Sequence, residues 1–124
     1  MHKAIQRGMI ASCHDCSDGG LAVALAETSI AGMLGLNIDL RLVPCRGKKR
    51  NDYILFSETA SRFIITVSPD KQRELEKIMA GNIIGFIGTV TNNDFVKVTG
   101  LEGKLIIREK IGALKNAWQK TLDF

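Results

Sequence analysis

The pattern of hydrophobic and polar positions predicts helices in four parts of the chain. The clearest is an apolar, alanine-rich run over residues 21–28, which is typical of a helix packed closely on its neighbours and ends at Gly32. Ser68-Pro69-Asp70 is a helix-start signal, because Ser caps helices, Pro fits the first helical position and Asp favours the positive end of the helix dipole. The remaining two are a short helix at residues 2–7 and a final helix whose apolar face carries Ile111, Leu114, Trp118 and Leu122.

Alternation of apolar and polar side chains predicts strands between these helices. Residues 9–13 form a short strand, and residues 36–40 and 61–68 alternate like half-buried strands. Three more strands are expected at residues 83–91, 95–99 and 104–108. The Asn-, Asp- and Gly-containing turns between those three favour an antiparallel meander. The run at residues 53–56 is too short to assign.

Length and composition fit one folded domain over residues 1–124. The chain has 124 residues, of which 45% are apolar, values typical of a single globular domain. The longest apolar run, Leu21 to Ala26, is much shorter than the ~20 residues that cross a bilayer, and the first residues lack the apolar stretch of a signal peptide. We therefore expect no membrane partner and a cytoplasmic location. The mixture of elements predicts an α+β fold with helices packed against a mixed, largely antiparallel sheet.

The charge distribution argues against a nucleic-acid-binding protein. Seventeen Lys and Arg residues against 13 Asp and Glu residues give a net charge of +4. The clearest basic cluster, residues 46–50, has a single aromatic neighbour, Tyr53. Proteins that bind nucleic acid usually combine larger basic patches with stacking aromatics. We interpret this cluster as a solvated loop and expect no nucleic-acid partner, with RNA contact as the alternative.

Two of the three cysteines, Cys13 and Cys16, form a C-x-x-C pair. A redox pair normally lies at a helix N-terminus, whereas residues 17–19 intervene here and Asp15 and Asp18 would oppose a thiolate. A structural zinc site needs four ligands, and the sequence has no second C-x-x-C. We therefore interpret both cysteines as buried or half-buried thiols without redox or metal-binding function.

One turn concentrates most of the candidate chemistry: His14-Asp15-Cys16-Ser17-Asp18-Gly19-Gly20, between a strand and an apolar helix. Glycines allow a backbone to approach a ligand closely, and the first N–H groups of a helix lack internal partners, so such a turn favours an anion. Carboxylates there would repel a phosphate unless a Mg²⁺ ion bridges the two sets of oxygens. The turn therefore predicts a loop that binds a Mg²⁺–nucleotide or Mg²⁺–phosphate, although its spacing matches neither a Walker A loop nor a dinucleotide fingerprint.

A purely structural interpretation of the same turn is helix capping. In that case Asp15, Ser17 or Asp18 caps the helix and Gly20 allows tight packing. Capping and ligand binding are compatible, so both interpretations stay open at this point. Further along the chain, Glu58 and Arg62 are interpreted as a surface ion pair, which would contribute little to stability.

The turn and the helix after it resemble a signature of the phosphoribosylformylglycinamidine synthase (PurL) family. Residues 14–27, HDCSDGGLAVALAE, are similar to that family's motif H-D-x-S-D-G-G-L-A-x-A-L-A-E. Three further stretches are similar, in order, to the family's L-F-x-E-x-x-S-R, I-G-x-V and L-x-x-A-W segments: residues 55–63, 87–90 and 114–118. The resemblance covers nearly the whole chain and implies the fold of the C-terminal domain of the aminoimidazole ribonucleotide synthase-related superfamily.

The resemblance implies that the chain is the C-terminal domain of a larger multidomain synthase of de novo purine biosynthesis. Such an enzyme is an ATP-dependent carbon–nitrogen ligase. It converts formylglycinamide ribonucleotide, glutamine, ATP and water into formylglycinamidine ribonucleotide, glutamate, ADP and phosphate. The implied partners are the preceding domains of the same synthase, a glutaminase subunit and a small accessory subunit. Because the family's catalytic residues lie in preceding domains, we expect no catalytic residue here and no activity from the chain alone.

The resemblance also implies roles for particular residues. In relatives with a bound nucleotide, the first Asp of the motif is a Mg²⁺ ligand and its Ser touches the nucleotide. Asp15 is therefore the implied metal ligand, and Ser17, Asp18, Gly19 and Gly20 are implied to lie beside ATP or ADP, which either turns over or is structural. The alternatives are another ATP-utilising enzyme of the superfamily, such as a small-molecule kinase, and a non-catalytic docking domain.

Overall fold

The computed structural model describes residues 1–47 and 49–120, so expectations about Lys48 and Leu122 lie outside the described residues. The helices are α1 (His2–Gln6), α2 (Gly20–Gly32), α3 (Asn51–Phe56), α4 (Gln72–Ile78) and α5 (Ile111–Lys120), with 3₁₀ turns η1 (Leu40–Leu42) and η2 (Pro69–Lys71). The strands are β1 (Ile10–Asp15), β2 (Gly35–Asp39), β3 (Phe63–Val67), β4 (Gly88–Thr91), β5 (Phe95–Thr99) and β6 (Leu105–Lys110). Every helix and strand assigned from the sequence has a counterpart.

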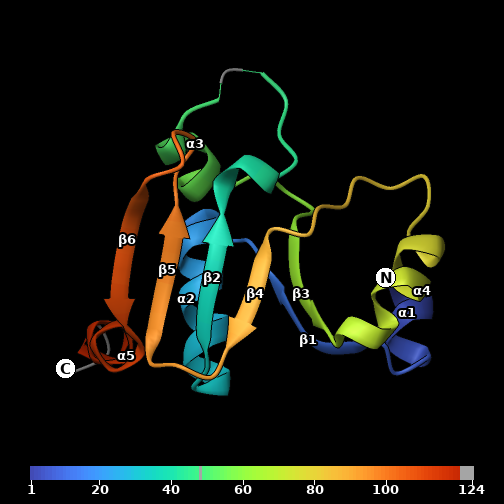
Figure 1. Ribbon diagram of the computed structural model, residues 1–124, viewed down its shortest axis with the longest axis horizontal. Coiled ribbons are helices and arrows are strands. Elements are labelled where there is room, and N and C mark those ends of the chain that lie inside the picture. The colour runs from blue at the N-terminus through green and yellow to red at the C-terminus, as the bar shows by residue number, and fades with distance from the viewer. Residues whose placement is uncertain (48, 121–124) are drawn as a thin grey trace.

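The strands form two sheets, which Figure 1 shows side by side. The larger has the order β4-β2-β5-β6, in which β2 runs antiparallel to β4 and parallel to β5, and β5 runs antiparallel to β6. The smaller is the antiparallel pair β1-β3. The α+β fold with a mixed, largely antiparallel arrangement is therefore confirmed.

The expected meander of three consecutive strands is wrong, because β2 lies between β4 and β5. Leu36 of β2 pairs with Val90 of β4 on one side and with Val96 of β5 on the other. The connection from β4 to β5 therefore crosses the start of β2. Gly35 permits this crossing, since a Cβ at that position would lie 2.6 Å from the Asn93 carbonyl oxygen. The hairpin of β5 and β6 is as predicted.

One predicted strand is shorter than expected, and the run left unassigned forms a helix. Only residues 88–91 of the strand expected at 83–91 pair with another strand, and residues 53–56 belong to helix α3. The predicted helix start is confirmed in position, because Ser68 is the N-cap residue, but Ser68 makes no side-chain capping hydrogen bond. Instead its carbonyl oxygen accepts a hydrogen bond from the Lys71 N–H, and Pro69 begins the 3₁₀ turn that precedes α4.

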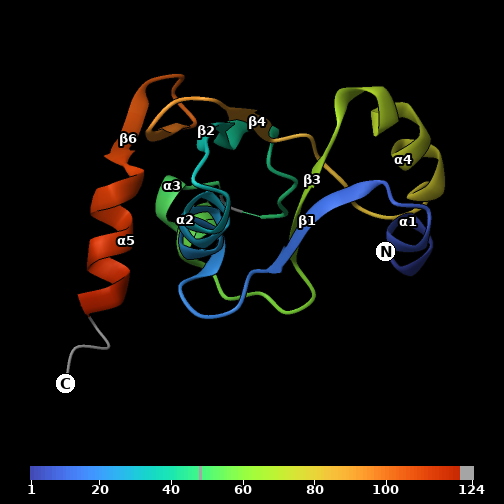
Figure 2. The ribbon, with the colours of Figure 1, turned by 90° about the horizontal axis from the view of Figure 1, so that it is seen from below.

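The main hydrophobic core lies between α2 and one face of the four-stranded sheet (Figure 2). α2 contributes Leu21, Ala24 and Leu25, each at most 3% exposed. Alternate residues of β2 and β5 belong to the same cluster: Leu36, Ile38, Val96 and Val98. A second cluster of Ala4, Met9 and Leu75 joins α1 to α4 at the far end of the β1-β3 pair. Within the described ranges, no helix has the length and apolarity needed to cross a membrane.

Candidate functional site

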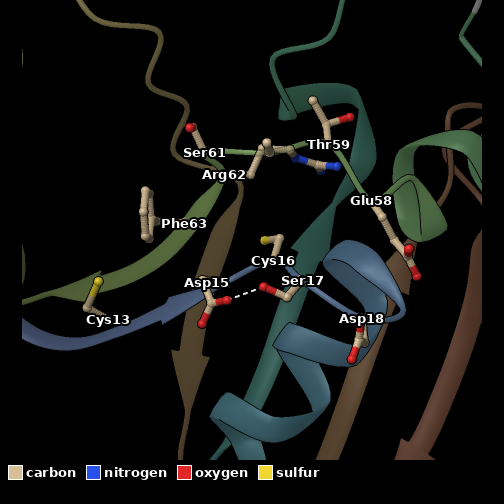
Figure 3. A pocket seen from close by; sticks show the side chains of 11 residues that line it. Cys13, Asp15, Cys16, Ser17, Asp18, Glu58, Thr59, Ser61, Arg62 and Phe63 are labelled. Atoms are coloured by element: carbon tan, nitrogen blue, oxygen red, sulfur yellow. Dashed lines mark hydrogen bonds between the residues drawn. The ribbon is translucent and has the colours of Figure 1, made fainter.

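The turn singled out in the sequence lines an open pocket beside the start of α2 (Figure 3). β1 ends at Asp15, the turn follows, and α2 begins at Gly20. The opposite wall is the connection from α3 to β3. The lining residues are Cys13, Asp15, Cys16, Ser17, Asp18, Glu58, Thr59, Ala60, Ser61, Arg62 and Phe63. Asp15, Ser17 and Asp18 are exposed, so these three predicted site residues are accessible to a ligand.

Asp15 and Ser17 form a hydrogen-bonded pair within the pocket. The Ser17 hydroxyl donates to Asp15 Oδ2. This hydrogen bond, helped by a backbone hydrogen bond of Asp15 itself, lowers the pKa of the Asp15 carboxyl below its ordinary value. A hydrogen bond to the charged form stabilises that form. Asp15 therefore presents an ionised oxygen donor, of the kind that hard cations such as Mg²⁺ prefer.

Removal of the Ser17 hydroxyl provides a test of this pairing by pH. In Ser17→Ala we expect the pKa of Asp15 to rise toward its ordinary value of 3.8, measured by NMR titration of the Asp15 carboxyl carbon. In the parent protein the pKa of Asp15 is lower in the folded state than in the unfolded state. The hydrogen bond therefore stabilises the fold at pH values above the unfolded-state pKa, and this stabilisation is lost as the pH falls through the folded-state pKa. An unchanged titration midpoint in Ser17→Ala would show that the hydroxyl does not act on Asp15.

The structure does not support capping of α2 by the side chains of the turn. The N-cap residue is Gly19, in the left-handed region with φ +77°, and no side-chain capping bond from the N-cap residue is present. The Gly19 N–H instead donates to Glu58 Oε1 at 2.9 Å. Glu58 lies in the connection after α3, and its negative charge interacts favourably with the positive N-terminal end of the α2 dipole. While Glu58 holds this N–H, the group is not free to bind a phosphate.

The two glycines are required by packing of the protein on itself. Gly20 has φ +64°, and a Cβ there would lie 2.7 Å from the Ser57 carbonyl oxygen and 3.0 Å from that of Leu55. The absence of a side chain at Gly20 therefore lets the start of α2 pack against the C-terminal end of α3. This contact brings α3 and Glu58 up to the start of α2.

Arg62 holds the same end of α3 and is not the partner of Glu58. Its Nη1 donates to the Ser57 carbonyl oxygen and to Ser57 Oγ, each at 3.0 Å, and its Nη2 donates to the Ile54 carbonyl oxygen at 3.4 Å. The expected ion pair is thus replaced by two separate interactions. Glu58 binds the start of α2, and the Arg62 guanidinium adds positive charge to the wall of the pocket.

Behind the pocket, a network of side chains joins β1, α2 and α5. His14 Nε2 lies 2.6 Å from Glu27 Oε2, and Trp118 Nε1 donates to Glu27 Oε1 at 3.1 Å. The other ring nitrogen of His14, Nδ1, lies 3.5 Å from Asp15 Oδ1. Sequence analysis did not find this network. The signal available was that His14, Glu27 and Trp118 all belong to the segments that carry the family resemblance.

Removal of the Glu27 carboxylate should measure the strength of this network. Glu27→Ala loses both hydrogen bonds, and we expect it to lower the free energy of unfolding by about 1–2 kcal/mol. Glu27→Gln keeps an oxygen acceptor for Trp118, so its loss should be smaller. Urea denaturation monitored by Trp118 fluorescence measures both. Equal losses in the two variants would show that the contribution comes from the negative charge of Glu27 and not from its hydrogen bond to Trp118.

The expectation that both cysteines of the C-x-x-C pair are buried or half-buried is confirmed for Cys16 and wrong for Cys13, which is exposed. Neither cysteine forms a disulfide. Burial raises the pKa of the Cys16 thiol, which is the opposite of what a reactive thiolate needs. Among residues 1–47 and 49–120, no group of three or more His, Cys, Asp or Glu side chains is arranged to hold a metal ion. A cation at Asp15 would therefore take its other ligands from a nucleotide, water or another domain.

Comparison with known proteins identifies the family to which this fold belongs. A family model described as "AIR synthase related protein, C-terminal domain" matches residues 1–100. The chain belongs to this family. Within the matched region of this AIR synthase-related domain lie both walls of the Asp15 pocket and the whole signature from His14 to Glu27.

The AIR synthase-related domain is similar to curated proteins named "Phosphoribosylformylglycinamidine synthase subunit PurL". It is 39% identical over 118 residues to the protein of Limosilactobacillus reuteri (strain DSM 20016), covering 95% of this chain and 15% of the relative. It is 36% identical over 121 residues to that of Alkaliphilus metalliredigens (strain QYMF), covering 96% of this chain and 15% of the relative. The domain thus spans about 15% of the length of these relatives.

Solved structures show the same fold. Thermotoga maritima PurL complexed with ATP superimposes with a TM-score of 0.80 at 23% identity, over 90% of this chain and 20% of that one. A chain of the HypE–HypF complex gives a TM-score of 0.71 at 19% identity, over 86% of this chain and 38% of that one. The AIR synthase-related domain therefore has the fold of a region of these larger proteins.

Proposed function

We propose that this chain is the C-terminal domain of a phosphoribosylformylglycinamidine synthase, the ATP- and glutamine-dependent ligase of purine biosynthesis. The similarity to PurL proteins over 95% of the chain carries the proposal. The accessible Asp15–Ser17 pair supports it, because the segment most similar to that family forms the pocket with an ionised oxygen donor. Solved T. maritima PurL complexes with ATP, ADP and AMPPCP show that a protein with this fold in one of its regions binds adenine nucleotides.

In this proposal the domain contributes one edge of a Mg²⁺–nucleotide site. The donor set fits a hard cation, since Asp15 is exposed and charged and its orientation is fixed by Ser17. A bound Mg²⁺ would neutralise phosphate charge beside Asp15. Ser17 and Asp18 would lie beside the nucleotide, while Gly19 and Gly20 shape the entry of α2 and leave Glu58 on the Gly19 N–H.

The remaining parts of the enzyme would lie outside these residues. Preceding domains of the synthase would supply catalytic residues and the other metal ligands, and a glutaminase subunit would supply ammonia, together with a small accessory subunit. The relatives are named as subunits, and a solved assembly is titled PurLQS from T. maritima. The complete enzyme would lie in the cytoplasm, and the 124 residues alone would have no activity.

An assay of the complete protein tests this function. The gene product that contains this chain should form formylglycinamidine ribonucleotide from formylglycinamide ribonucleotide, ATP and ammonia, and should restore growth of a purine-requiring strain. Asp15→Ala should lose this rescue, whereas Asp70→Ala, an exposed carboxylate outside the pocket, should keep it. Transfer of phosphate to a small molecule without amidine formation would favour the kinase alternative.

A non-catalytic docking role is the second candidate, and one observation favours it. Many large apolar side chains are exposed in the described chain: Ile5, Met33, Leu34, Leu42, Tyr53, Phe56, Phe63, Ile83, Val90, Leu105, Ile106 and Trp118. Exposed apolar surface marks sites of protein contact when it is contiguous. A docking domain predicts that Asp15 substitutions leave nucleotide binding unchanged, which separates it from the first proposal.

A further inference from the structure

An apolar groove between the two sheets is not used by the proposed nucleotide site. One side is formed by residues 64–67 of β3, and the other by residues 84–90, which include most of β4. Leu25 of α2, Ile38 of β2 and Leu75 of α4 also line this inter-sheet groove. Its volume is about 310 Å³. Figure 1 shows β3 and β4 as neighbouring edges of the two different sheets.

The groove exposes the edges of both strands as well as side-chain faces. Successive side chains of a strand point to opposite faces, yet four consecutive residues of β3 and three of β4 line the groove. Within the described chain, β3 pairs only with β1, and β4 pairs only with β2. The backbone N–H and C=O groups on the other side of each strand therefore have no strand partner among the described residues.

Two of the features that usually prevent further strand pairing are missing from both edge strands. Natural edge strands are often protected by charged side chains or proline. β3 has the sequence FIITV and β4 has GTVT, without a charge or a proline in either. A two-stranded sheet such as β1-β3 is also marginal by itself. These edges have the chemistry of strands in the interior of a continuous sheet.

We propose that an extended segment of the larger synthase, from outside these 124 residues, lies in the inter-sheet groove as a β-strand and pairs with β3 and β4. This rests on the proposed function in one respect, namely that the chain is part of a longer polypeptide. The chain spans about 15% of the length of its curated relatives, so most of such a polypeptide is available to supply the segment. Its inward side chains would be apolar and uncharged, because Leu25, Ile38 and Leu75 line the groove and no charged residue does. Pairing by strand addition would join the two sheets into one.

Photo-cross-linking in the complete protein tests this proposal. A photo-reactive phenylalanine analogue is placed at Val90, which lines the groove and is 46% exposed, and separately at Thr66 on the opposite side. Both should cross-link to one and the same peptide of the same polypeptide outside these residues, in which alternate side chains are apolar and uncharged. The same probe at Gln119, an exposed residue of α5 outside the groove, should not yield that peptide. Cross-links to a second copy or to another subunit, or none from either groove position, would overturn the proposal.

Amide hydrogen exchange on the unmodified complete protein provides a second readout. Residues 64–67 and 88–91 should exchange as slowly as residues 36–38 of the central strand β2, and fast exchange at either edge would overturn the proposal. Mg²⁺–ADP binding measured on the same sample separates the two proposals. If Mg²⁺–ADP binds but the edge strands exchange fast, only the proposal of a strand in the groove is overturned. If the edge strands exchange slowly but Mg²⁺–ADP does not bind, only the proposed nucleotide site is overturned.

Discussion

Gly20→Ala is expected to lower the free energy of unfolding by about 3 kcal/mol or more. Two costs add at this position. The φ of +64° is unfavourable for any residue with a Cβ, and that Cβ would lie 2.7 Å from the Ser57 carbonyl oxygen, 2.9 Å from the Phe56 carbonyl carbon and 3.0 Å from the Leu55 carbonyl oxygen. All three atoms are backbone, so a side-chain rotation cannot relieve the contact. Chemical denaturation measures the loss.

Gly112→Ala is the matched control for this substitution. Gly112 lies in α5, and a Cβ there would have no heavy atom within 4 Å. Because Ala favours a helix over Gly and Gly112 lies in the first turn of α5, this change should be neutral or stabilising by at most about 0.5 kcal/mol. Gly20→Ala should also break the hydrogen bond between the Gly19 N–H and Glu58, because the added Cβ would displace α3 and with it Glu58. A Gly20→Ala protein as stable as the parent would contradict the close packing of α2 on α3.

Local structure was predictable wherever one pattern dominated a segment. The alanine-rich run at residues 21–28 is in the middle of α2, and the β5–β6 hairpin follows from its turn. The predictions failed where contacts between residues distant in sequence determine the local structure. Residues 83–87 have the apolar content of a strand but pass over the loop after η1, where a Cβ at Gly85 would lie 2.8 Å from the Leu42 carbonyl oxygen. The first residue of α3, Asn51, accepts a hydrogen bond from the Leu101 N–H at 2.9 Å, 50 residues further along the chain.

The candidate site was predictable in its location and not in its hydrogen bonds. The motif placed Asp15, Ser17 and Asp18 together, and all three line one pocket. The carboxylate at the start of α2 comes from Glu58, 39 residues further along the chain. Periodicity and spacing describe neighbours on one element, so they gave no means to pair Glu58 with Gly19. The same limit hid the contact between Glu27 and Trp118, which are 91 residues apart.

Asp15→Asn is expected to weaken the binding of Mg²⁺–ADP to the complete protein by at least about tenfold. The substitution keeps the size of the side chain and its ability to accept from Ser17, and it removes the negative charge that would hold the cation. Isothermal titration calorimetry measures the affinity with and without Mg²⁺. The loss should appear only when Mg²⁺ is present, because the carboxylate by itself repels the nucleotide.

Two comparisons make this result specific to Asp15. Asp70→Asn removes an equal charge from an exposed position outside the pocket and should leave the affinity unchanged. Ser17→Ala should weaken binding less than Asp15→Asn, since it removes the hydroxyl that orients the carboxylate but keeps the charge. Equal affinities for the parent and Asp15→Asn proteins in Mg²⁺ would favour the docking role.

The structure of the complete protein with Mg²⁺ and ADP tests most directly whether this domain holds the cation against the nucleotide. We predict an Asp15 carboxylate oxygen at about 2.1 Å from the ion, the usual distance for Mg²⁺, with Ser17 in contact with the nucleotide. Ion and nucleotide bound elsewhere, with the Asp15 pocket still open to solvent, would contradict the account.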